Sequence, residues 1–177
     1  MTGDDYVPPD ESVEVRTTEQ LRAVSNLVRH RVLAVLRDGP ATITQIATRL
    51  DLAKGSSSYH VRVLERAGLI HVVRTNKVRG VIERYYGMVA RVIELPDPAP
   101  GQRDVLMQHA TADLATAPEG TPRLVRMKHL RLSESRFAEF EQRIGALLDE
   151  MHEARDDDEA AATIAVAFFR PGEGAAR

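Results

Sequence analysis

The chain contains no cysteine, and this absence excludes several kinds of chemistry. Disulfides, thiolate metal sites and cysteine nucleophiles all require that residue. The sequence also lacks any run approaching the roughly 20 apolar residues that span a bilayer, and its polar, acidic N-terminus does not have the pattern of a signal peptide. We therefore expect a soluble cytoplasmic protein with no membrane partner, because a reducing compartment suits a chain without disulfides.

Motifs that mark catalytic sites are absent as well. The sequence has no glycine-rich phosphate loop, no quartet of metal ligands and no nucleophile motif. The serines at 56–58 have no evident general base with its orienting residue. We therefore predict that the protein is not an enzyme and needs no cofactor.

Two histidine–carboxylate pairs leave one form of metal binding open. His109 and Asp113, and likewise His152 and Asp156, are four residues apart and would share a helix face. Such pairs bind metals through nitrogen and oxygen. They also arise easily by chance in an acid-rich region, where a surface ion pair is the simpler interpretation. We predict no metal site.

The formal net charge of −2 conceals a segregation of charge along the chain. Residues 16–91 contain 14 Lys and Arg against 5 Asp and Glu, whereas the rest of the chain contains 10 against 21. A basic module attached to an acidic remainder is expected when only one part contacts phosphate. The basic part is therefore the candidate for binding nucleic acid.

Within the basic part, residues 42–84 have the pattern of a winged helix-turn-helix. Residues 42–50 predict a short helix, with Thr42 and Gln45 placed for a capping box. After a short turn, residues 56–68 predict the recognition helix, which ends at a glycine. This order of elements indicates that double-stranded DNA is the partner.

The rest of this stretch predicts a β-hairpin with a basic tip. Residues 69–74 and 81–86 are apolar and β-branched, as strands are, and residues 75–80 predict the turn between them. Basic side chains at such a tip suit an adjacent minor groove or the DNA backbone.

A recognition helix needs small or polar residues where it approaches the major groove, and basic residues near the phosphates. Simpler roles exist for several candidates: Ser56 or Ser57 as a helix cap, Tyr59 in packing, and His60 as a buried histidine. Ser57 also shares an inward-facing spacing with Val61. We predict as DNA-binding residues Lys54, Ser56, Ser57, Ser58, Tyr59, His60, Arg62, Arg66, Arg74, Lys77, Arg79 and Arg84.

The N-terminal part divides into a tail and a domain. Residues 1–12 combine prolines, acidic residues and few apolar ones, which predicts disorder. Residues 13–94 are predicted to form the winged helix-turn-helix domain. Its first helical region begins after an N-cap at Thr17 or Thr18 and is either one helix or two, with a break near residues 25–26.

A proline-rich boundary separates this domain from residues 101–170, which are followed by a tail at 171–177. In the second region, residues 124–132 and 163–169 have the pattern of strands. A helix precedes them, and a longer one lies between them. We predict that this region dimerises and holds any effector site.

The longer helix of the second region has the stronger pattern. Ser133 is placed to cap it, and apolar residues recur along it at helical spacing. We predict as dimerisation residues Phe137, Phe140, Ile144, Leu147, Leu148 and Met151.

Several motifs of the basic part resemble those of the ArsR-type winged helix-turn-helix regulators of bacteria. They are residues 29–36 (RHRVLAVL), 43–47 (ITQIA), 58–64 (SYHVRVL), 67–70 (AGLI) and 79–86 (RGVIERYY). The resemblance implies a homodimeric repressor or activator on a pseudo-palindromic operator. Metal sensors of this type that use thiolates need a cysteine pair, and thiol redox sensing needs cysteine too, so any effector of this chain acts differently.

Together these features predict an α+β, mainly helical protein, with a winged helix-turn-helix followed by an α/β dimerisation region. Its predicted function is sequence-specific regulation of transcription, with double-stranded DNA, a second copy and an unidentified small effector as partners. The alternative is a winged-helix module that binds a protein or a small effector and has no operator specificity of its own.

Overall fold

The computed structural model describes residues 6–78, 80–96, 104–154, 159 and 162–171 of the chain. The chain divides into two compact units, Met1–His109 and Ala110–Arg177. Within the described residues, no helix has the length and apolar character needed to cross a membrane.

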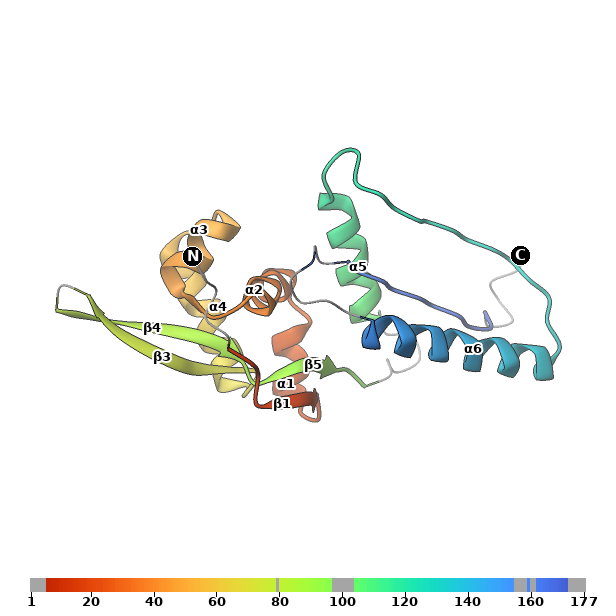
Figure 1. The fold of residues 1–177 in the computed structure, drawn as a ribbon, viewed down its shortest axis with the longest axis horizontal. Helices are drawn as coiled ribbons and strands as arrows, with labels where there is room; N and C mark the ends of the chain where they lie inside the picture. The colour runs from red at the N-terminus through yellow and green to blue at the C-terminus, as the bar shows by residue number, and fades with distance from the viewer. Residues whose placement is uncertain (1–5, 79, 97–103, 155–158, 160–161, 172–177) are drawn as a thin grey trace. The chain divides into compact units, whose positions relative to one another are not determined.

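The first unit is a winged helix-turn-helix of the α+β class (Figure 1). Strand order in its three-stranded antiparallel sheet is β2-β4-β3, and β1 pairs with β5 in a separate parallel sheet. The elements are β1 (Asp10–Glu14), α1 (Thr18–Val24), α2 (Leu27–Arg37), β2 (Ala41–Thr42), α3 (Ile43–Leu50), α4 (Lys54–Arg66), β3 (Ile70–Val78), β4 (Val81–Met88) and β5 (Ala90–Glu94).

Side-chain caps fix where the first three helices begin. Thr17 caps α1 in a reciprocal capping box with Gln20, and Asn26 caps α2 by accepting from two backbone N–H groups. The helical region is therefore two helices, with the break at the predicted place. Thr42 and Gln45 form the predicted capping box at the start of α3.

The core lies between the helices and the base of the hairpin. Ile46, Val61, Leu64 and Ile70 are almost completely buried, and they come from α3, α4 and β3. Burying each such side chain contributes about 1.5–3 kcal/mol, so the inward faces of α3 and α4 hold these two helices in a fixed arrangement. Their opposite faces remain exposed to solvent.

Two predicted boundaries in this unit are wrong. Helix α4 begins at Lys54 after Ala53, whose methyl group cannot cap it, and not at a serine cap. The strands of the hairpin continue to Val78 and resume at Val81, so the turn is two residues long, with Gly80 at a φ of +84°. Arg79 lies outside the described residues.

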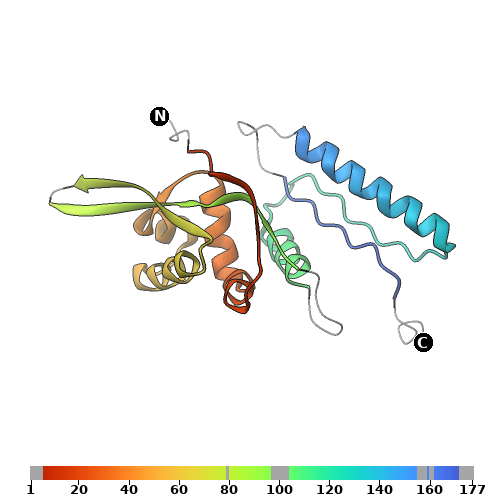
Figure 2. The same ribbon diagram turned by 90° about the horizontal axis from the view of Figure 1, so that it is seen from below.

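The N-terminal segment is ordered where disorder was predicted. Residues 10–14 form β1, which pairs in parallel with β5 (Figure 2). The Tyr6 hydroxyl donates a hydrogen bond to the Met88 carbonyl oxygen at 2.7 Å. The partners lie about eighty positions further along the sequence, so composition near the N-terminus gave no indication of them.

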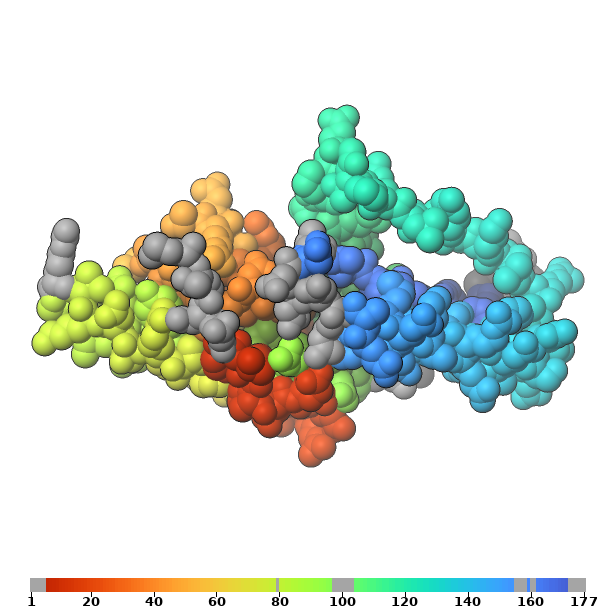
Figure 3. Space-filling model, in the orientation of Figure 1, coloured from red at the N-terminus to blue at the C-terminus, as the bar shows by residue number. Residues whose placement is uncertain are grey.

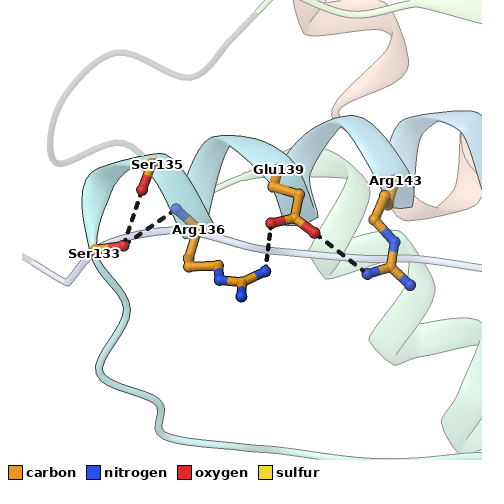
Figure 4. A network of polar contacts seen from close by, with 5 residues as sticks. All are labelled: Ser133, Ser135, Arg136, Glu139 and Arg143. Atoms are coloured by element: carbon orange, nitrogen blue, oxygen red, sulfur yellow. Dashed lines mark hydrogen bonds and ion pairs between the residues drawn. The ribbon is translucent and has the colours of Figure 1, made fainter.

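The second unit contains part of α5 (Val105–Thr116) and α6 (Glu134–Glu153). Ser133 caps α6 as predicted, and Arg136 and Arg143 both contact Glu139 on its polar side, at 2.7 and 3.8 Å (Figure 4). The remaining face of the helix carries the predicted apolar residues.

Residues 124–132 and 163–169 are extended, but neither segment is a paired strand within the described residues, so this prediction is wrong. Phe168 stacks on Phe137 of α6 at 4.3 Å between ring centres, and Arg170 lies over the same Phe137 ring. No described residue from 110 to 171 is buried. The apolar pattern that predicted strands therefore stays exposed to solvent.

Candidate nucleic-acid interface

Helix α4 has one buried face and one exposed face. Ser57, Val61 and Leu64 point into the core, at the i, i+4 and i+7 positions of the helix. The opposite face carries a shallow hollow lined by Gly55, Ser58, Tyr59, Arg62, Glu65 and Arg66. Four of the predicted DNA-binding residues therefore meet on one surface.

Ser57 does not belong to that surface. Its side chain is completely buried, and its hydroxyl oxygen has no hydrogen-bond partner among the described residues. Its prediction as a DNA contact is therefore wrong, and its inward-facing spacing with Val61 was the correct signal. Ser56, by contrast, is exposed at the start of the helix.

The first turn of α4 is open to a partner. Lys54 and Gly55 are exposed, and a methyl group added at Gly55 would meet nothing within 4 Å. Glycine costs a helix roughly 1 kcal/mol relative to alanine, and nothing within the described part of the chain requires it here. The open space at Gly55 leaves room for a phosphate backbone to approach closely. The positive end of the helix dipole favours an anion at the same place.

Arg29 of α2 links the helix α1 to this surface. Its guanidinium donates hydrogen bonds of 2.6 Å to the carbonyl oxygens of Arg22 and Ala23, at the end of α1. Burial lowers the pKa of Arg29, while Tyr59 opposes this shift. Sequence reasoning did not select Arg29, because its place beside α4 depends on tertiary packing.

His60 lies next to Tyr59, with the two rings edge to face and their centres 5.3 Å apart. Burial lowers the pKa of His60, and the positive charge of Arg29 lowers it further. Both effects favour the neutral form of the imidazole. Its Nδ1 atom is buried without a hydrogen-bond partner among the described residues, so part of this ring belongs to the protein interior.

The wing hairpin has two faces, and a β-bulge between Val72 and Arg74 changes which residues of β3 lie on each face. Cross-strand partners share a face of a hairpin. At the base, Val72 lies opposite Tyr86 and both pack against the helical core. Along β4 the same face continues outward through Arg84 and Ile82.

Beyond the bulge, this helix-side face carries two of the predicted basic residues. Thr75 lies opposite Arg84, and Lys77 lies opposite Ile82. Arg74 is on the other face, where its guanidinium lies 4.1 Å from the centre of the Tyr85 ring. The structure therefore groups Lys77 with Arg84 and separates Arg74 from both.

Figure 3 shows this hairpin, in yellow-green, projecting beyond the helices of the first unit. On the helix-side face of its outer part, Thr75, Lys77, Ile82 and Arg84 are all exposed. Within the described residues, no group of three or more His, Asp or Glu side chains is arranged to hold a metal ion. His109 is buried and stacked on His30, with ring centres 4.0 Å apart, while Asp156 lies outside the described residues.

A family model described as a helix-turn-helix domain matches residues 24–73. Solved structures similar to the chain include a homodimeric winged helix-turn-helix DNA-binding domain from Mycobacterium bovis, described as a possible ArsR-family transcriptional regulator. The two sequences are 18% identical, the match covers 55% of this chain and 74% of the other, and the TM-score is 0.35.

Two further solved structures are similar over a comparable part of the chain. HlyU from Vibrio cholerae is 22% identical, with 55% of this chain and 84% of that one covered and a TM-score of 0.33. The cadmium metal-sensor CMTR from Mycobacterium tuberculosis is 19% identical, with 67% and 99% covered and a TM-score of 0.32. A comparison with curated proteins finds no match.

The fold and the family match define the class of this protein: it carries a winged helix-turn-helix domain, as predicted. Its sequence motifs resemble those of ArsR-type regulators. In helix-turn-helix domains that bind DNA, the second helix lies in the major groove.

Proposed function

We propose that the protein regulates transcription by binding a specific, pseudo-palindromic operator as a homodimer. The observation that carries this proposal is the exposed face of α4. Its outward residues Tyr59, Arg62 and Arg66 line one surface, while the opposite face is fixed in the core. A helix held in this way can enter a major groove as a rigid element.

The residues divide by the part of DNA that each would contact. Small and aromatic side chains near the start of α4, such as Ser56, Ser58 and Tyr59, suit base edges. Arg62 and Arg66 lie further along, and Lys54 lies at the first turn, where they suit phosphates. The wing adds Lys77 and Arg84 on one face.

A dimer would place two copies of α4 about 34 Å apart, in successive major grooves. We assign dimerisation to residues 101–170 and DNA binding to residues 13–94. The support is the apolar stripe of α6, where Leu147 and Met151 are 52% and 46% exposed. Phe137 contributes less to this stripe, because Phe168 and Arg170 of the same chain already pack against its ring.

DNA binding is tested by fluorescence anisotropy with labelled promoter DNA of the protein's own gene, against random-sequence DNA. We expect preferential binding that weakens steeply with salt. A dimer with 6–10 phosphate contacts would lose about 10³–10⁵ in affinity between 50 and 200 mM salt. A flat salt response, or equal affinity for both DNAs, contradicts the proposal and favours a protein-binding winged helix.

The dimer is tested by analytical ultracentrifugation of the full chain. Glutamate at both Leu147 and Met151 places charges in the apolar stripe, so we expect dissociation to monomers. Gln142→Glu adds one charge at an exposed polar position of the same helix and serves as the control. A dimer that survives the double substitution places the interface elsewhere.

Repression or activation is tested separately with a reporter gene behind the bound promoter. We propose repression, since a protein bound over a promoter excludes other proteins from it. Increased reporter output in the presence of the protein contradicts repression.

A further inference from the structure

Two neighbouring apolar residues near the tip of the wing are exposed to the same extent but on opposite faces. Val81 is 66% exposed and Ile82 is 64% exposed. Val81 lies opposite Val78, on the face that also carries Glu83. Ile82 lies opposite Lys77, on the helix-side face. The two positions therefore differ in their surroundings and hardly at all in burial.

The helix-side face has the composition of a DNA-contacting surface with one apolar residue in it. Its described outer residues are Thr75, Lys77, Ile82 and Arg84, and none of them is a carboxylate. The positive charges fit a phosphate backbone on either side of a groove. A cationic surface of this kind fits DNA better than it fits an apolar protein partner.

We propose that Ile82 enters the minor groove beside the α4 site and makes the wing a reader of base composition. This inference rests on the proposed function, since it requires the protein to bind DNA. Lys77 and Arg84 hold the hairpin to the phosphates, and Ile82 lies over the edges of the base pairs. The wing then selects A·T pairs over G·C pairs in the sequence that flanks the α4 site.

The selection follows from the chemistry of the minor groove. A·T and T·A pairs show only acceptors there, whereas a G·C pair adds the guanine 2-amino group as a donor. An isoleucine over that amino group excludes water and offers no acceptor, so the donor stays unpaired. We expect a G·C pair at this position to weaken binding on the order of tenfold. Apolar side chains of other proteins also enter the minor groove, where they are inserted between base steps.

The test uses duplexes selected from random-sequence DNA by the wild-type protein. In each flank the pairs are made A·T, G·C or inosine·cytosine. Inosine·cytosine keeps the major-groove pattern of G·C but lacks the 2-amino group. A difference in binding between these two flanks therefore reports the minor-groove amino group. Binding of the wild type, Ile82→Thr and Val81→Thr is measured by anisotropy. Threonine is β-branched like the residues it replaces, which keeps the preference for strand.

For the wild type we expect A·T and inosine·cytosine flanks to bind equally, and G·C flanks about tenfold more weakly. Ile82→Thr should lose most of this difference, because its hydroxyl can accept from the amino group. Val81→Thr should keep it. Inosine also alters the shape of the duplex, but that effect is common to all three proteins, and circular dichroism verifies that the variants are folded.

The other outcomes contradict either the role proposed for Ile82 or the proposed function. A wild type that binds all three flanks equally refutes the minor-groove reading of Ile82 and leaves the proposed function intact. Loss of the difference in Val81→Thr but not in Ile82→Thr shows that the other face of the hairpin contacts DNA. A wild type that selects no DNA at all refutes the proposed function itself.

Discussion

The Arg74 guanidinium lies over the Tyr85 ring, 4.1 Å from its centre, on the face of the wing that points away from the helices. This cation–π contact binds the arginine to the hairpin itself. Lys77 lies three residues further along and therefore faces the opposite side, and the bulge before Arg74 makes this the helix-side face. Two basic residues that look equivalent in the sequence are therefore expected to act differently.

Replacing these two residues by alanine tests the difference. Lys77→Ala should weaken binding to operator and random DNA alike and lower the salt slope by about one unit, because one phosphate contact is lost. Arg74→Ala should leave the slope unchanged and lower the free energy of unfolding by about 0.5–1 kcal/mol. Anisotropy at several salt concentrations and urea denaturation measure the two effects. Equal salt slopes for the two variants would refute the division of the wing into two faces.

A similar division is expected along α4. Arg62→Ala should weaken binding to all sequences by a similar factor, because under the proposed function this arginine contacts phosphate. Tyr59→Ala or His60→Ala should instead change which sequences are preferred, by about 1–3 kcal/mol at the affected base pair. Selection from random DNA with each variant measures the preference. Identical losses on operator and random DNA for all three variants would contradict this assignment.

Features of the fold with local causes were predictable from the sequence. The capping box of Thr42 and Gln45 and the cap at Ser133 depend on residues three positions apart. The inward faces of α3 and α4 follow from helical periodicity. Most of the exposed residues of α4 were predicted for the same reason, since they are the positions that the core does not use.

Features with distant causes were not predictable. The bulge that places Lys77, and not Arg74, on the helix-side face is a property of strand pairing, and β1 depends on a partner strand about eighty positions away. Residues 124–132 show that a local pattern can also predict an element that does not form. Their apolar pattern predicted a strand, but a strand also needs an edge to pair with, and the described part of this unit supplies none.

The buried hydroxyl of Ser57 provides a prediction about stability. It is a polar group in the core without a partner among the described residues, and leaving such a group unpaired costs about 1–3 kcal/mol. Ser57→Ala should therefore raise the free energy of unfolding by roughly 1 kcal/mol and leave DNA binding unchanged. Urea denaturation and anisotropy measure both. Weaker DNA binding in a stable Ser57→Ala variant would restore Ser57 to the DNA-binding residues.

His60 provides a prediction about pH. Its pKa is lowered in the folded protein, so the unfolded chain, with a histidine pKa of about 6.5, binds the proton more readily. Above about pH 6.5, His60 is neutral in both states and its stabilising contribution is fully present. The contribution is lost as the pH falls below about 6.5, because the unfolded chain then binds the proton first. His60→Gln should show a smaller loss of stability on acidification than the wild type. His30 and His109 are present in both proteins, so they cancel in the comparison; equal acid sensitivity would contradict the burial of His60.

Gly87 provides a prediction about the N-terminal segment. A methyl group at this position would lie 2.7 Å from Cε1 of Tyr6 and 2.8 Å from Cγ1 of Val73, so Gly87→Ala must displace one or both side chains. Displacing Tyr6 also breaks its hydrogen bond to the Met88 carbonyl oxygen. We expect a loss of about 1–3 kcal/mol in the free energy of unfolding. In a Tyr6→Ala background the same substitution should cost less, because only Val73 still resists it, and a double-mutant cycle measures the difference. Strict additivity would mean that Tyr6 does not pack on Gly87 in solution, and that the segment preceding β1 is disordered as its composition predicts.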